Sequence, residues 1–168
     1  MDLPATAPNP PDARPLTIGI DIRRAGEFGV GIYTKNLVRC LGRIAPENRY
    51  VLVGTPEQRK QIGDIGPNSR LEVYERRYDS FRSHLEYGLL VRRLGVDVFH
   101  IPHRWAPLST PQPYVSTLHD LNHLLFPRDE NAGPLDWARY WALRRGLQRA
   151  TLIVAVSQAT RRDAVSGL

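Results

Sequence analysis

The sequence predicts an α/β fold in which a doubly wound, Rossmann-like parallel sheet of about six strands is covered by helices. Six short apolar runs recur along the chain, at residues 16–22, 50–54, 71–74, 97–101, 114–118 and 151–156. Most are continuously apolar and do not alternate, as is typical of strands covered on both faces. Helical patterns separate several of the runs, which is the alternation expected of βαβ units.

Amphipathic helices are predicted between several of these strands. The first carries apolar residues three or four positions apart, namely Val30, Tyr33, Leu37, Leu41 and Ile44. A second pattern over residues 87–94 ends at Gly95, and a third extends over residues 135–147. This spacing places apolar side chains on one face of a helix, which can then pack on the sheet. The run at residues 71–73 alternates instead, so we expect that strand near an edge of the sheet.

Length and composition indicate one folded domain at residues 16–168. With 168 residues and 42% hydrophobic content, the chain can bury a single core. Residues 1–15 hold five prolines and no apolar cluster, which is typical of a disordered tail. No stretch reaches the roughly 20 apolar residues of a transmembrane helix. Cys40, the single cysteine, fits a reducing cytoplasm, and peripheral contact with the inner face of a membrane is left open.

The charge balance is basic, with 23 Lys+Arg against 17 Asp+Glu and a formal net charge of +6. Most of the excess is arginine, which suits phosphate groups and anionic surfaces. The basic residues are scattered along the chain, so nucleic acid is not expected as a partner. Five arginines could meet an anionic acceptor or lipid head group, although solvated surface charge is the preferred interpretation: Arg23, Arg24, Arg76, Arg77 and Arg104.

A glycine-rich turn with Gly26, Gly29 and Gly31 joins the first strand to the first helix. Glycines let a backbone approach a ligand, and the N–H groups at a helix start favour an anion. The expected guest is a phosphate or a sugar hydroxyl, unless the glycines only make the corner. A nicotinamide site is not expected, because the second strand ends in Gly-Thr-Pro at residues 54–56 without an acid. A P-loop is excluded, because no Gly-Lys-Ser/Thr follows the glycines.

Four of the five histidines follow the fourth and fifth strands: His100, His103, His119 and His123. Spacings of three and four residues could supply metal ligands. However, Asn122 and Pro127 do not favour a helix there, no cysteine is near, and Asp120 is the one adjacent carboxylate. We therefore expect no metal site.

The pair His119–Asp120 ends the fifth strand and points toward the same crevice as the glycine turn. An imidazole there can hydrogen-bond a sugar hydroxyl, and the carboxylate can orient the imidazole or accept a hydroxyl itself. The structural alternative, in which Asp120 caps a turn and His119 is a satisfied half-buried side chain, stays equally open on these residues alone.

Four segments between residues 16 and 163 resemble motifs of family-4-type glycosyltransferases of the GT-B fold. Residues 29–37, GVGIYTKNL, are similar to a G-x-G-x-Y-x-x-x-L opening, and residues 97–102, DVFHIP, to a D-(V/I)-x-H-x-P strand. Residues 117–121, TLHDL, are similar to T-(I/V)-H-D-L. Residues 150–163, ATLIVAVSQATRRD, are similar to the A-x-x-(I/V)-(I/V)-x-V-S-x-x-(S/T)-x-x-D run before the domain crossover.

The resemblance implies roles for individual residues. Gly29, Val30 and Gly31 match a loop that lies against the donor pyrophosphate and the transferred sugar. His119 matches a histidine that contacts the sugar undergoing transfer, and Asp120 matches its neighbour, so these two are the predicted catalytic residues. The acceptor-side candidates are Arg23, His103 and Arg104.

The resemblance also implies the chemistry. Such enzymes transfer a hexose from a nucleotide-diphosphate sugar, usually with retention, to a glycan, lipid or small-molecule acceptor. They stabilise an oxocarbenium-like state and the departing phosphate electrostatically. The nucleotide sugar is a co-substrate, and no cofactor or metal is expected. Ser157 is expected to cap the helix that follows it.

Enzymes of this family build the active site between two Rossmann-like domains, and the second domain grips the nucleotide with basic residues and an E-x₇-E motif. This chain matches the acceptor-side domain, so we expect the donor-binding domain to come from a missing C-terminal part or a partner chain. The 168-residue chain alone is expected to be nearly inactive. The alternative is a non-catalytic sugar- or nucleotide-binding module that pairs with a separate donor domain. Exposure of Trp105, Trp137 and Trp141 would favour that alternative, and their burial in the core would not.

Overall fold

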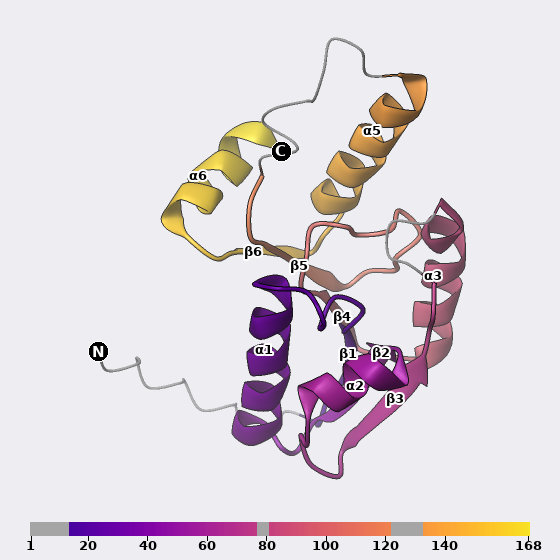
Figure 1. Ribbon diagram of the computed structural model, residues 1–168, viewed down its shortest axis with the longest axis vertical. Helices are drawn as coiled ribbons and strands as arrows, with labels where there is room; N and C mark the ends of the chain where they lie inside the picture. The colour runs from indigo at the N-terminus through magenta and orange to yellow at the C-terminus, as the bar shows by residue number, and fades with distance from the viewer. Residues whose placement is uncertain (1–13, 77–80, 122–132) are drawn as a thin grey trace.

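A six-stranded sheet forms the centre of the computed structural model, which describes residues 14–76, 81–121 and 133–168. The strands are β1 (Thr17–Asp21), β2 (Arg49–Gly54), β3 (Ser69–Val73), β4 (Val98–Ile101), β5 (Tyr114–Leu118) and β6 (Leu152–Ala155). Their order in the sheet is β3-β2-β1-β4-β5-β6, and every neighbouring pair is parallel (Figure 1). The predicted α/β class and parallel sheet are confirmed. β5 has the predicted bounds, and β3, whose sequence alternates, lies at an edge.

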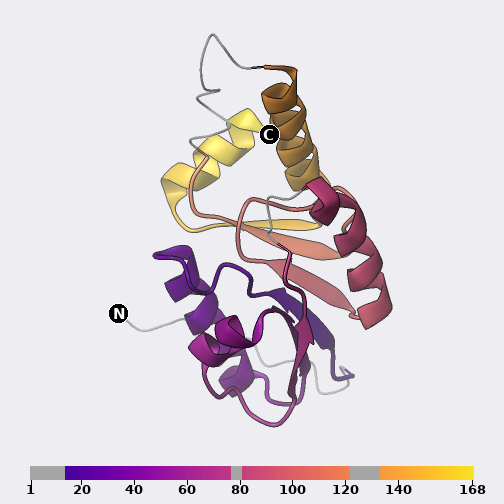
Figure 2. The same cartoon turned by 45° about the vertical axis from the view of Figure 1, so that its right-hand side comes forward.

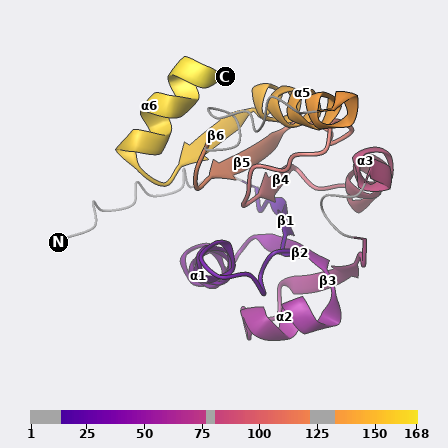
Figure 3. The ribbon, with the colours of Figure 1, turned by 45° about the horizontal axis from the view of Figure 1, so that its top comes forward.

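Helices cover both faces of this sheet. In the described ranges they are α1 (Val30–Ile44), α2 (Pro56–Ile62), α3 (Phe81–Leu94), α5 (Pro134–Gln148) and α6 (Gln158–Gly167). α1 and α2 lie on one side, and α3 and α5 lie on the other (Figures 1 and 3). The core shows why the strands are continuously apolar. Tyr50 and Leu52 of β2 pack in the cluster beneath α1 and α2, while their neighbour Val53 packs in the cluster beneath α3.

One helix, α2, follows β2 without having been predicted. Its sequence carries a start signal, because Thr55 and Gln58 form a capping box with Pro56 at the first helical position. Gln58 N donates to Thr55 Oγ1 at 3.3 Å, and Thr55 N donates to Gln58 Oε1 at 2.8 Å. The helix is only seven residues long, so it offers too little apolar periodicity to be recognised by spacing, whereas the capping box could have revealed it.

The helix cap expected at Ser157 is confirmed, since Thr160 N donates to Ser157 Oγ at 3.0 Å. In the described part of the chain, none of the helices combines the length and apolarity needed to cross a bilayer. Most of the predicted tail at residues 1–15 lies outside the described residues, and so do Arg77 and His123.

Candidate functional site

The three loops that carry the predicted site residues all leave the sheet at the carboxyl ends of its parallel strands. They follow β1, β4 and β5, which are consecutive in the sheet. The strand order reverses here, because β1 pairs with β2 on one side and with β4 on the other. In open α/β sheets, the carboxyl ends of strands at such a reversal are where ligands bind. The topology therefore brings the glycine turn, residues 102–113 and the His119–Asp120 pair to the same edge.

The glycine turn ends with Gly29 as the residue before α1. Gly29 has a φ of 74° and a ψ of −75°, a backbone conformation that residues with a Cβ rarely adopt. A Cβ on Gly31 would lie 2.4 Å from the carbonyl oxygen of Ala25, so only glycine fits this contact. The amides of Val30 and Gly31 donate within the turn, to Phe28 O and Glu27 O, both at 2.9 Å. In this conformation those two amides are thus occupied, and the predicted contact of Gly29, Val30 and Gly31 with a donor stays a prediction.

His119 lies between the ends of β4 and β5 and the first turn of α1. Its Nε2–H donates to the carbonyl oxygen of Pro102 at 3.0 Å. The ring stands edge-on to Tyr33, with the ring centroids 5.0 Å apart and an interplanar angle of 86°. Because Nε2 carries the proton, Nδ1 of the neutral ring is a hydrogen-bond acceptor. The structure thus brings His119 beside the helix that follows the glycine turn.

Thr117 and His100 form a hydrogen-bonded pair that contacts Tyr33, the residue against which the His119 ring packs. Both residues lie in the segments singled out from the sequence, but their pairing is not predicted there. Thr117 Oγ1 lies 2.8 Å from His100 Nε2 and 3.2 Å from the hydroxyl oxygen of Tyr33. Thr117 is fully buried. Burial lowers the pKa of His100 to about 4, so its ring is neutral at physiological pH. These contacts fix Tyr33, and through it the edge against which His119 packs.

Asp120 forms an ion pair with Arg104 of the loop after β4. Asp120 Oδ1 lies 3.5 Å from Arg104 Nη1, and the Asp120 side chain is 45% exposed. Exposed pairs of this kind contribute little to stability, typically up to about 1 kcal/mol. The Asp120 carboxylate therefore contacts the loop after β4 through Arg104 and is also accessible to solvent.

Two of the acceptor-side candidates, Arg23 and His103, belong to a buried cluster built on Asp21. Arg23 Nη2 lies 2.6 Å from Asp21 Oδ2, and Arg23 Nη1 donates to Ser83 Oγ at 3.1 Å. The Arg23 guanidinium lies over the ring of Tyr87, 4.0 Å from its centroid. His103 Nε2 lies 3.4 Å from the same Asp21 oxygen, and its side chain is fully buried.

The ion pair in this cluster is charged at neutral pH. Burial alone would raise the pKa of Asp21, but Arg23 and then His103 outweigh it and hold that pKa well below its usual range. Burial likewise opposes the charge of Arg23, and the Asp21 carboxylate raises the Arg23 pKa above its ordinary value. Sequence reasoning missed Asp21; its signal was a carboxylate at the end of an apolar strand, two residues before an arginine. The cluster holds the loops after β1 and β4 together from inside the protein.

The three described histidines at the ends of β4 and β5 do not converge on one point. His100 contacts Thr117, His103 contacts Asp21, and His119 contacts Pro102. Over residues 14–76, 81–121 and 133–168, no group of three His, Cys, Asp or Glu side chains is arranged to hold a metal ion.

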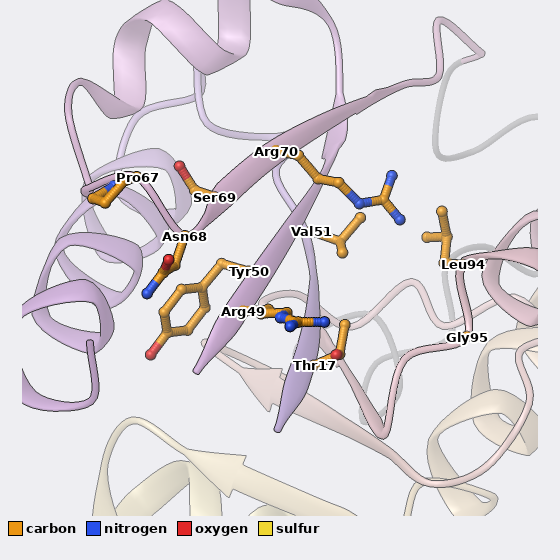
Figure 4. A pocket seen from close by; sticks show the side chains of 10 residues that line it. All are labelled: Thr17, Arg49, Tyr50, Val51, Pro67, Asn68, Ser69, Arg70, Leu94 and Gly95. Atoms are coloured by element: carbon orange, nitrogen blue, oxygen red, sulfur yellow. The ribbon is translucent and has the colours of Figure 1, made fainter. Parts of the chain in front are cut away.

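A hollow of about 500 Å³ opens at the amino ends of β1, β2 and β3, on the opposite side of the sheet from the carboxyl ends that carry the candidate site. Figure 4 shows the side chains that line it, among them Thr17, Arg49, Asn68 and Arg70. Arg70 is paired with Glu72 at 3.2 Å. None of the predicted site residues lines this hollow, so it is separate from the candidate site.

Comparison with known proteins identifies a family for this chain. The family described as Glycosyltransferase Family 4 matches residues 29–168, from the end of the glycine turn to the last residue of the sequence. Among curated proteins, none matches the chain closely enough to count as a relative. The matched range includes Gly29 and Gly31, the loop after β4 and the His119–Asp120 pair. Since the match covers most of its length, the chain belongs to glycosyltransferase family 4.

Proposed function

We propose that this chain forms the acceptor-side half of a GT-B glycosyltransferase, which transfers a hexose from a nucleotide-diphosphate sugar with retention. The acceptor is a carbohydrate or a lipid-linked molecule, and a second domain grips the nucleotide. The supporting observation is the convergence at one sheet edge of His119, held by Pro102 O at 3.0 Å, with the helix that follows the glycine turn. The lone exposed Cys40 suits a reducing cytoplasm as the place of reaction.

The proposed reaction breaks the bond between C1 of the hexose and the phosphate oxygen, and the nucleoside diphosphate leaves with the electron pair. The acceptor hydroxyl oxygen forms the new bond to C1, and its proton passes to the departing diphosphate oxygen. His119 keeps its Nε2–H on Pro102, so Nδ1 accepts a hydrogen bond from a hydroxyl of the transferred sugar. Asp120 carries negative charge at the site edge, where it stabilises an oxocarbenium-like state. Arg23 and His103 act indirectly in this proposal, because they are buried beneath the loops.

The proposal is tested by measuring the nucleoside diphosphate that is formed from a sugar donor. The enzyme is the native polypeptide that carries this sequence. UDP-, GDP- and ADP-hexoses are offered singly, each with soluble and lipid-linked acceptors. We expect one donor to be consumed, and about 100-fold less turnover in H119A, the size of effect seen when one stabilising polar group is removed. D120N is also expected to lower turnover, and its matched control is D64N, at an exposed aspartate of the loop after α2. Release that is equal in wild type and H119A would contradict the role of His119.

A second candidate function is the non-catalytic module that pairs with a separate donor domain. It is favoured by Trp137 and Trp141 on α5, whose exposed fractions are 56% and 61%. Trp105, in contrast, is partly buried against the cluster beneath α5. The intact mass of the native polypeptide separates the two functions. A mass about twice that of this chain supports the two-domain enzyme, and a mass equal to it supports the module.

A further inference from the structure

An apolar groove of about 760 Å³ lies between α3, α5 and the loop after β4. Figures 2 and 3 show the two helices on the same side of the sheet. Among the described residues, its apolar lining consists of Leu85, Trp105, Leu108, Leu135, Ala138 and Ala142. Concave, mostly apolar sites of roughly 300–1,000 Å³ are those that bind small molecules. The groove therefore has the size and the chemistry of a ligand site.

Two glycines, one on each helix, seat the loop that forms the floor of this groove. A Cβ on Gly88 of α3 would lie 2.0 Å from Ser109 O, and a Cβ on Gly146 of α5 would lie 2.2 Å from Ala106 O. Gly88 N donates to Ser109 Oγ at 3.1 Å. The loop backbone thus lies directly on both helices, which positions Trp105 and Leu108 beneath the groove. Because contacts with α3 and α5 hold this loop in place, the groove is preorganised for a ligand.

The upper walls of the groove leave large apolar side chains in contact with water. Leu85 of α3 is 65% exposed and Leu135 of α5 is 60% exposed. Covering such side chains removes apolar surface from water, which favours the complex. An alkyl or prenyl chain laid between α3 and α5 would cover both at once.

The polar side chains that line the groove are basic or neutral. Arg139 of α5 and His84 of α3 line it together with Ser109. Nδ1 of His84 is buried without a hydrogen-bond partner among the described residues. Burial, and then the nearby charge of Arg23, lowers the pKa of His84, so its ring is neutral. No described carboxylate lines the groove, and this charge distribution complements a ligand with an anionic head group.

The loop after β4 carries neighbouring residues that belong to the candidate site and to the groove. Arg104 pairs with Asp120, and the next residue, Trp105, lines the groove. The Arg104 guanidinium carbon lies 6.0 Å from the centroid of the Trp105 ring. An acceptor whose reacting hydroxyl reaches Asp120 can therefore extend its apolar part along Trp105 toward the groove.

We propose that this groove holds the alkyl or prenyl chain of the acceptor, which is an amphiphile with a phosphate-bearing head group. The assignment rests on the proposed glycosyl transfer and specifies its acceptor class. It concerns a single bound molecule and not adhesion to a bilayer.

Binding is measured with dodecyl phosphate below its critical micelle concentration, on the 168-residue chain in a W137F/W141F background. Trp105 is then the sole tryptophan, and its fluorescence reports occupation of the groove. We expect saturable binding, weakened about tenfold by L85Q, as loss of one apolar contact of more than 1 kcal/mol requires. L89Q is the matched control, because Leu89 lies one turn further along α3, is 58% exposed and does not line the groove. Equal affinities of L85Q and L89Q would overturn the proposal.

The head-group part is tested with probes that share one chain and differ in charge. Dodecyl maltoside and dodecyltrimethylammonium are expected to bind several-fold more weakly than dodecyl phosphate. R139Q is expected to reduce this preference, and R145Q, on the same helix but outside the groove, is expected to leave it unchanged. Preferential binding of the cationic probe, or binding to phosphatidylglycerol vesicles without binding of monomers, would overturn the assignment. Since the readout is fluorescence, probe binding without any transfer activity would leave the groove standing and reject the proposed reaction.

Discussion

The carboxylate of Asp21 and the guanidinium of Arg23 form an ion pair inside the protein, with Oδ2 and Nη2 2.6 Å apart and side chains 0% and 3% exposed. The pair connects the end of β1 to α3, because Arg23 also donates to Ser83. It further contacts the loop after β4 through His103. Elements that are far apart in the sequence but border the candidate site therefore depend on one buried charge pair.

Removing either member of this pair is expected to destabilise the protein strongly. D21N and R23M should each lower the free energy of unfolding by about 3–5 kcal/mol, because each leaves an uncompensated buried charge. The double variant should lose less than the sum of the two single losses. Urea denaturation of the four proteins measures this coupling. Additive losses would show that Asp21 and Arg23 do not stabilise one another.

The buried histidines are expected to make stability fall in mild acid. Burial lowers the pKa of His100 from 6.5 to about 4, and it lowers the pKa of His103 as well. The unfolded chain therefore binds protons that the folded protein excludes, so stability decreases as the pH falls from 6.5 toward 4. The His100 ring contributes up to about 3 kcal/mol of this loss.

The variant H100Q should flatten that pH dependence, because glutamine does not titrate. Urea midpoints at about pH 7, 5.5 and 4.5 measure the slope for both proteins. Asp21 stays ionised across this range, since its pKa is held well below its usual value. An unchanged slope in H100Q would assign the acid sensitivity to other groups.

Substitution of Gly29 is expected to separate backbone strain from ligand binding. Gly29 and Gly95 both have positive φ, 74° and 61°, and a Cβ on either would meet no atom within 4 Å. G29A and G95A should each cost about 1–3 kcal/mol of stability, the cost of holding a residue with a Cβ in a sparsely populated backbone region. If the glycine turn binds the donor, only G29A should also weaken binding of the nucleotide sugar, measured by calorimetry on the active polypeptide. Equal effects of both variants on binding would count against the turn.

Substitution of Gly88 by alanine is expected to destabilise the protein, although alanine has the higher helix propensity. Alanine inside a helix is favoured over glycine by about 1 kcal/mol. In G88A, however, the new Cβ would lie 2.0 Å from Ser109 O, so the loop after β4 must move. Overpacking of this kind costs about 1–3 kcal/mol. Thermal unfolding should therefore occur at a lower temperature in G88A than in L89A, an exposed change one residue away.

Much of the fold follows from local patterns. The continuous apolar runs predict the strands because each strand is covered on both faces, as the placement of Leu52 and Val53 in different clusters shows. Ser157 is identifiable as a cap because its contact with Thr160 spans only three residues. The motif at residues 117–121 likewise predicts where His119 and Asp120 leave the sheet.

The environments of the candidate residues depend on contacts that no local pattern encodes. From the sequence, Arg23 is predicted to be a solvated surface charge. In the structure it is buried, because Asp21, Ser83 and Tyr87 contact it from separate elements. The tautomer of His119 depends on Pro102, which belongs to a neighbouring strand end.

Local patterns along the chain predict the strands, their sequential order and the family motifs at the strand ends. Only the folded protein shows which of those residues are buried, which hydrogen bonds they make, and that Gly88 and Gly146 support a groove beside the candidate site. The two kinds of feature arise over different distances along the chain. Strand and cap signals arise from neighbours along the chain, whereas burial and desolvation depend on residues brought together by the crossovers between parallel strands.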